Sequence, residues 1–221
     1  LYEKLLRRAA GLGGVDPHSH GEGFSKEFLH AEVAVVGGGP AGISAALAAA
    51  GQGAQVLLFE EQPALVGHLR WAGRGPAPVL PGWLQDLERQ PRIQVFPGTM
   101  ITGWYADHWL VAVQGKHLFK IRAQMVVAAT GAYEQPLLFV GNDLPGVMLG
   151  GAVLRLLRLY GVVPGRKAVV VADNEDGWEV VQALQEAGVE LKAVVTRGGN
   201  EHTAALEVAG VFRSQQQAEP G

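Results

Sequence analysis

Residues 33–60 read VAVVGGGPAGISAALAAAGQGAQVLLFE, and this stretch decides the fold of the chain around it. The apolar run 34–36 predicts a buried strand, and the alanine-rich run 43–50 predicts a helix with Gly51 as its C-cap. A second apolar run, 56–59, predicts another strand. Strand, glycine turn, helix and strand in this order are typical of a dinucleotide-binding βαβ unit.

Three glycines join the first strand to the helix in G-x-G-x-x-G spacing. Gly37 allows the tight turn, Gly39 lets the backbone approach a pyrophosphate, and Gly42 lets helix and strand pack closely. The helix N-terminus offers unpaired N–H groups to the phosphates, and Glu60, 18 positions after Gly42, is placed to accept from ribose hydroxyls. The alternative is a glycine-rich turn in an ordinary α/β domain. The residues expected to bind the cofactor here are Gly37, Gly39, Pro40, Ala41, Gly42 and Glu60.

The loop after Glu60 is rich in turn formers and is expected where a nucleotide would cross the strand ends. Glu61 and Gln62 are further candidates for the adenosine ribose. Arg70 and Arg74 are candidates for neutralising phosphates, with plain surface charge as an equal alternative.

The composition supports a folded protein and excludes several functional classes. The 221 residues suffice for one or two domains, and a hydrophobic content of 48% supports a core. A net charge of −3 argues against nucleic acid as a partner. No apolar run approaches the roughly 18 residues that span a bilayer, and the N-terminal segment lacks the apolar core of a secretory signal. We therefore expect a soluble, cytoplasmic protein with no membrane partner.

The chain contains no cysteine, which is its most informative count. A redox dithiol, a disulfide framework and a cysteine-ligated iron–sulfur cluster are thereby excluded within these residues. Electron transfer must run through a bound organic cofactor or through another polypeptide.

Downstream of the βαβ unit, the pattern predicts an antiparallel meander and then a return to the first sheet. The apolar run 125–129 predicts the returning strand, and Thr130 and Gly131 at its end are also expected to bind the cofactor. The other elements predicted here are a helix at 83–89 and strands at 92–96, 101–105, 109–113 and 118–121.

A second, smaller βαβ unit follows, with strands at 168–172 and 191–196 around a helix at 178–187. Its loop lacks the glycine spacing and places three carboxylates at the helix N-terminus: Asp173, Glu175 and Asp176. These suit the helix dipole but repel a pyrophosphate. We expect a structural unit with a vestigial nucleotide site.

The predicted fold class is α/β, a Rossmann-like dinucleotide-binding domain with a β-meander followed by this smaller nucleotide-binding-like unit. In the predicted helix 152–160, Arg155 and Arg158 are expected on a solvated face, with pairing to acidic residues or contact with a partner as the alternatives. Near the N-terminus, His18 and His20 have only Glu22 nearby, so no metal site is expected. The predicted divisions are an arm at 1–31, a dinucleotide domain at 32–135, a linker and helix at 136–164, the second unit at 165–200 and a tail at 201–221, where 206–212 is compatible with one more strand.

With both units in view, the chain resembles the glutathione-reductase-like flavoprotein superfamily, through residues 37–42, Glu60 and the strand VVAATG at 126–131. It resembles more closely the α-subunits of heterotetrameric sarcosine oxidase, and their relatives in dye-linked proline dehydrogenase and hydrogen cyanide synthase. The stretches that carry this likeness are YEKLLRRAAGLGG at 2–14, FEEQPALVG at 59–67 and ATGAYEQPLLFVGNDLPGVMLGGAVLRLLRLYGVVPGRKAVVV at 129–171. The pyrophosphate-facing loop of the family corresponds to Gly67-His68.

The resemblance implies a subunit of a flavin-dependent enzyme that oxidises a secondary amine or imino acid such as sarcosine or proline. It implies FAD as the cofactor, with NAD or another adenine nucleotide as the alternative, and substrate oxidation in a β-type flavoprotein partner. The sequence names no catalytic acid or base. For His68, Tyr133 and Glu134, which follow predicted strands, structural roles are expected.

Two other functions stay open at this point. The chain is also compatible with a nucleotide-binding or regulatory module without turnover. A self-sufficient NAD(P)H-dependent flavin reductase is the third reading, against which the acidic loop at 173–176 and the lack of cysteine count.

Overall fold

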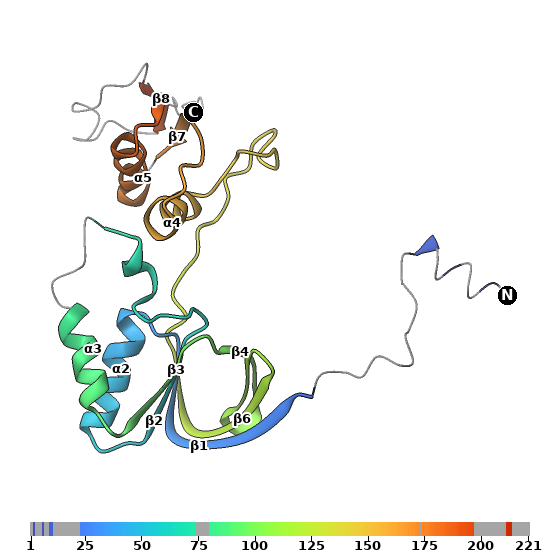
Figure 1. Cartoon of the computed structure of the whole chain (residues 1–221), viewed down its shortest axis with the longest axis vertical. Coiled ribbons are helices and arrows are strands. Elements are labelled where there is room, and N and C mark those ends of the chain that lie inside the picture. The colour runs from blue at the N-terminus through green and yellow to red at the C-terminus, as the bar shows by residue number, and fades with distance from the viewer. Residues whose placement is uncertain are drawn as a thin grey trace, which may run out of the picture.

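The computed structural model describes residues 2, 6, 9–10, 23–73, 80–172, 174–196 and 211–213 of the chain. These residues form two sheets, each with helices packed on it, and Figure 1 shows an extended connection between them. We call the part around the six-stranded sheet the first unit and the part around the three-stranded sheet the second unit. Both contain helices and parallel strands, which confirms the predicted α/β class.

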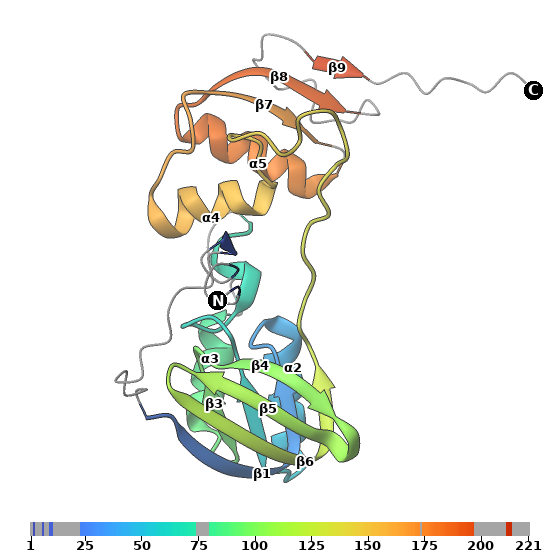
Figure 2. The same cartoon turned by 90° about the vertical axis from the view of Figure 1, so that its right-hand side faces the viewer.

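The six-stranded sheet of the first unit has the strand order β3-β2-β1-β6-β5-β4. Strands β1, β2, β3 and β6 are parallel, whereas β5 and β4 continue the sheet as the predicted antiparallel meander. Figures 1 and 2 show α2 and α3 on one side of the sheet and the curled meander on the other. The strands are β1 Ser25–Val36, β2 Val56–Phe59, β3 Ile93–Phe96, β4 Met100–Tyr105, β5 Trp109–Gln114 and β6 His117–Ala128; the helices are α2 Pro40–Gly51 and α3 Leu80–Arg89, with short 3₁₀ turns η1 Gly67–Arg70 and η2 Ala106–His108.

The core of the first unit lies on both faces of this sheet. Val33 and Val35 of β1 pack toward α2, whereas Ala34 between them packs toward the meander. All four residues of β2 are buried, as expected for a central parallel strand covered on both faces. On the meander side, the rings of Phe59 and Phe96 stack with centroids 5.0 Å apart.

Two strands are longer than the sequence pattern predicts. Strand β1 begins at Ser25, inside the expected arm, because residues from Ser25 to Val36 pair with β6 in parallel register. Strand β6 is continuous where two strands were predicted, since its pairing with β1 goes on after its antiparallel pairing with β5 ends at Arg122. The exposed residues of β1 over 25–32 are polar except for Phe28, which is 68% exposed, so the apolar run 34–36 predicts only the buried end of the strand.

The predicted end of α2 is wrong by one residue. Gly51 lies inside the helix, and Gln52 is the C-cap. The Gln52 N–H group donates to the carbonyls of Ala48 and Ala49. Gly53, rather than Gly51, takes the left-handed conformation that turns the chain away, with φ 95°.

The second unit is a parallel sheet of order β7-β8-β9, and Figure 2 shows α4 and α5 together on one side of it. Trp178 and Leu184 of α5 join Val194 of β8 in its buried core. Strand β9 overlaps the end of the segment 206–212, where a further strand was considered, and extends one residue beyond it. Residues 206–210 lie outside the described residues. Its elements are α4 Gly150–Tyr160, β7 Lys167–Val171, α5 Glu175–Glu186, β8 Glu190–Thr196 and β9 Val211–Arg213.

Several sequence predictions fall outside the described residues, namely those on His18, His20, Glu22, Arg74 and Asp173. In the described part of the chain, no helix combines the length and the apolar character that a bilayer crossing requires. The predicted domain boundaries stay predictions.

Substituting Gly42 tests the close packing of α2 against the glycine turn. A Cβ atom on Gly42 would lie 1.8 Å from the Gly37 carbonyl oxygen, so Gly42→Ala is expected to lower the free energy of unfolding by about 1–3 kcal/mol. Gly51→Ala in the same helix is the matched control, because a Cβ there meets no atom within 4 Å and replacing a helical glycine stabilises by about 0.5–1 kcal/mol. Urea unfolding followed by tryptophan fluorescence measures both; equal effects of the two variants would contradict the packing argument.

Candidate dinucleotide-binding site

The glycine turn connects β1 to α2 at the carboxyl end of the sheet. Gly37 has φ 106°, and a Cβ atom there would lie 2.2 Å from the Ala129 carbonyl oxygen. Its N–H group donates to the carbonyl of Phe59 at 2.8 Å, which ties the turn to the end of β2. Gly37 is therefore required by the fold itself, through both its backbone conformation and the close approach of β6.

Gly39 differs from the other glycines of the turn because its front is open. It is the N-cap residue of α2, in an extended conformation with no side-chain cap, and Pro40 follows at the first helical position. A Cβ atom built on Gly39 meets no protein atom within 4 Å. The free N-terminus of α2 and its partial positive charge thus face unfilled space, an arrangement suited to an anionic group.

Glu60 is almost fully buried at the end of β2, with 6% of its surface exposed. One carboxylate oxygen accepts from the Gly38 N–H group at 2.7 Å, and the other accepts from the Gln62 N–H group at 2.8 Å. The side chain therefore braces the glycine turn and the following loop, a role that the sequence pattern did not reveal. A carboxylate has about four acceptor positions, so its capacity to accept from ribose hydroxyls is not exhausted.

The loop after Glu60 folds back onto the glycine turn. The Val66 N–H group donates to the Gly38 carbonyl at 2.8 Å, and a Cβ atom on Gly67 would lie 3.2 Å from Gly39 Cα. Val66 has φ 74°, which is rare for a β-branched residue and indicates that its surroundings impose this conformation. No signal in the sequence marked Val66.

The remaining residues predicted to bind the cofactor lie at different distances from the glycine turn. Thr130 is adjacent to the turn, since a Cβ on Gly37 would lie 3.3 Å from Thr130 Cα. Gly131 follows in a left-handed conformation with φ 74°. The side chain of Arg70 is exposed at the end of η1, and the exposed Glu61 and Gln62 share a hydrogen bond of 3.3 Å. Binding roles for all of these residues stay predictions.

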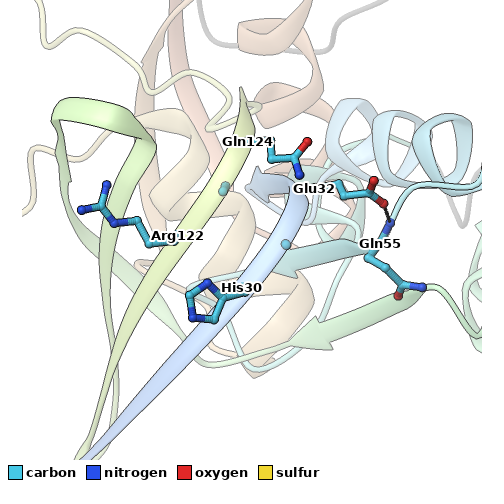
Figure 3. A pocket seen from close by; sticks show the side chains of 7 residues that line it. His30, Glu32, Gln55, Arg122 and Gln124 are labelled. Carbon is cyan, nitrogen blue, oxygen red and sulfur yellow. Dashed lines mark hydrogen bonds between the residues drawn. The ribbon is translucent and has the colours of Figure 1, made fainter.

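A separate surface depression of about 370 Å³ lies at the other end of the sheet, near the start of β2 (Figure 3). The Gln55 N–H group donates to Glu32 at 2.8 Å beside it. None of the predicted site residues lines this depression, and its polar side chains are exposed. Its lining residues are His30, Ala31, Glu32, Gln55, Arg122, Ala123 and Gln124.

The corresponding turn of the second unit is closed by its own residues. Asn174 caps α5 and accepts from the Gly177 N–H group at 2.9 Å, and Glu175 and Asp176 occupy the first turn. A Cβ atom on Gly177 would lie 2.8 Å from Ala172 Cα, so this glycine serves close packing between helix and strand. The vestigial character of this turn stays a prediction, which its capped and acidic helix N-terminus supports.

Glu60→Gln tests the bracing role of the buried carboxylate. The amide keeps one acceptor oxygen and turns an NH₂ group toward the other backbone N–H, so we expect a loss of about 1–3 kcal/mol in the free energy of unfolding at pH 7. Glu61→Gln is the control, because Glu61 is exposed and the change should stay within about 0.5 kcal/mol. Chemical denaturation compares the two variants. If Glu60→Gln leaves the free energy of unfolding unchanged, the carboxylate does not brace the turn.

Comparisons with known proteins agree with this geometry. The sequence model of the family described as pyridine nucleotide-disulphide oxidoreductase matches residues 31–218. Sarcosine oxidase subunit alpha of Rhizobium meliloti (strain 1021) is 36% identical over 214 residues, covering 88% of this chain and 22% of the relative. The subunit of the same name from Corynebacterium sp. (strain P-1) is 34% identical over 231 residues, covering 95% of this chain and 24% of the relative.

A solved structure shares the fold as well. L-proline dehydrogenase from P. horikoshii matches with a TM-score of 0.67 and 29% identity, over 83% of this chain and 40% of that chain. The chain spans less than a quarter of the length of the two sarcosine oxidase subunits. These matches confirm the resemblance inferred from the motifs and place the chain in an oxidoreductase family. The chain belongs to the pyridine nucleotide-disulphide oxidoreductase family, with sarcosine oxidase alpha subunits among its homologues.

Proposed function

We propose that the chain binds the diphosphate of an adenine dinucleotide at residues 37–42, as part of a flavin-dependent oxidoreductase. The contrast among the glycines carries this proposal. A Cβ atom on Gly37, Gly38 or Gly42 would collide with protein atoms, whereas one on Gly39 meets nothing. Packing within the chain therefore accounts for three glycines of the turn, and a ligand close to the backbone accounts for the fourth.

The residues present fit the shared ADP part of FAD and NAD. The N-terminus of α2 is suited to the diphosphate, and Glu60 is suited to ribose hydroxyls, whereas its carboxylate would repel a 2′-phosphate. We place FAD first and NAD second among the candidate cofactors; when bound, either one supplies the capacity to accept a hydride. The chain's contribution is to hold and orient the cofactor through its backbone N–H groups and one buried carboxylate.

The substrate class rests on the relatives. The oxidase and the dehydrogenase are named for sarcosine and proline. Both compounds carry a secondary amine next to an oxidisable carbon. We propose that a substrate of this kind is oxidised in a partner subunit of β type, consistent with relatives named as subunits. Of the residues considered for catalysis, Glu134 has a structural function, because it accepts from the Gly151 N–H group at the start of α4 at 2.7 Å. The cytoplasmic location stays a prediction.

A self-sufficient NAD(P)H-dependent flavin reductase is the less favoured reading. It would require a second dinucleotide site, and the α5 turn carries Glu175 and Asp176 where that phosphate would approach. Only an experiment can distinguish a nucleotide-binding module without turnover from the proposed oxidoreductase subunit.

Gly39→Val is expected to abolish dinucleotide binding without unfolding the protein. The residue has φ −76° and ψ −176°, a conformation that valine adopts readily, and its side chain would enter open space that the diphosphate needs. Isothermal titration with FAD, NAD and ADP should show at least about a hundredfold weaker binding. The free energy of unfolding should fall by only about 1 kcal/mol, because valine is a poorer N-cap residue than glycine. Unchanged affinity for all three would remove the basis of the site.

The function itself is tested by purifying the chain alone and together with a co-expressed partner subunit. We expect an adenine dinucleotide to be extracted from the wild type and not from Gly39→Val, and amine-dependent dye reduction to appear only with the partner. Yellow protein that bleaches with NADH in the absence of a partner would favour the flavin reductase instead. Dinucleotide without amine-dependent turnover in any combination would favour the non-catalytic module.

A further inference from the structure

One short segment contacts both the glycine turn and the second unit. It comprises residues 66–73, and we call it the strap. We propose that the strap couples dinucleotide binding in the first unit to the position of the second unit; this regulation of the site rests on the proposed function. In Figure 2 its η1 turn lies between the first unit and α4.

At its beginning, the strap is held by the candidate site. Val66 donates its N–H group to the Gly38 carbonyl at 2.8 Å, and Gly67 approaches the backbone of Gly39. The left-handed conformation of Val66, which is unfavourable for valine, is imposed where the strap meets the turn. A diphosphate in front of Gly39 would therefore lie next to the start of the strap.

At its end, the strap is held by the second unit. Trp71 packs on that unit's buried core, and its ring edge is close enough that a Cβ on Gly151 of α4 would lie 3.3 Å away. The Arg155 guanidinium lies 5.0 Å from the centre of the Trp71 ring, within the range of a cation–π contact. Both contacts attach Trp71 to α4.

Polar contacts complete this attachment. Arg158 donates to the Trp71 carbonyl at 2.6 Å and forms an ion pair with Glu179 of α5, while the Gly73 N–H group donates to Glu179 at 2.5 Å. The side chains of Arg158 and Glu179 are only 24% and 19% exposed, so solvent screens their pairing less than at a surface. The prediction of a solvated helix face is therefore wrong for Arg158, which has the acidic partner named as an alternative. Arg155 is exposed as predicted, although its guanidinium also contacts the Trp71 ring.

Between its two ends the strap is short and internally bonded. Leu69 donates to the Val66 carbonyl at 3.2 Å, and Trp71 and Ala72 donate to the His68 carbonyl at 3.0 and 2.8 Å. These bonds restrict the torsions between Val66 and Trp71, so we expect a displacement at Val66 to reach Trp71. Because coupling between two sites is reciprocal, docking of Trp71 on α4 must strengthen dinucleotide binding by the same factor by which binding strengthens docking.

Hydrogen–deuterium exchange with and without saturating ADP tests the coupling, with Trp71→Ala as the uncoupled variant. In the wild type, ADP should slow exchange at residues 37–43 and also in α4 and α5. In Trp71→Ala it should slow exchange at 37–43 alone, and titration should show about fivefold weaker ADP binding. Trp71→Phe should retain part of the long-range effect, and Arg158→Met, which cuts the polar contacts without touching the ring, should weaken it.

Trp104→Ala is the matched control, because Trp104 is a half-exposed tryptophan on β4, far along the chain from the strap. It should leave both the affinity and the exchange pattern unchanged. Slowing at 37–43 in the wild type without any slowing in α4 or α5 would overturn the coupling and leave the proposed function standing. No slowing at 37–43 with ADP, NAD or FAD would overturn the proposed function and the coupling with it.

Discussion

Three backbone segments converge at the carboxyl end of β1 so closely that no Cβ atom fits between them. The glycine turn meets the end of β6 at Ala129 and the first turn of α2 at Gly42, with hypothetical Cβ contacts of 2.2 and 1.8 Å. This contact sets where β6 ends beside β1 and how α2 leaves the sheet. With α2 held in this direction, its N-terminus faces the open side of Gly39, and the candidate site exists before any ligand arrives.

Glu60 supports the same region through charge rather than through packing. Burial of a carboxylate is costly unless backbone N–H groups replace the water, and here Gly38 and Gln62 provide them. As a result, the Glu60 carboxylate is already hydrogen-bonded within the protein at the position where a ribose is expected. In return the loop is organised in advance, which lowers the entropy lost on binding.

The two units contain related βαβ elements, but the N-termini of their helices differ. The first leaves the N-terminus of α2 uncapped and open, whereas the second fills the equivalent place with Asn174 and two acidic residues. The family is named for pyridine nucleotides and disulphides, yet these 221 residues contain no cysteine, so no dithiol within them can exchange electrons. Any electron transfer assigned to this stretch depends on what it binds, and the strap shows that the two units are not independent in space.

The sequence by itself determined those features for which the local backbone requires a particular type of residue. Gly37 and Gly42 mark positions without room for a Cβ, the apolar run 56–59 marks a strand buried on both faces, and the missing glycine spacing before α5 marks a different turn. Tertiary structure alone decided the rest: the polar start of β1 is a strand because Ser25 lies beside His117, 92 positions away, and Trp71 is an anchor because α4 lies against it. Such contacts depend on which distant surfaces meet, and since neither partner carries a local signature of the other, no pattern along the chain predicts them.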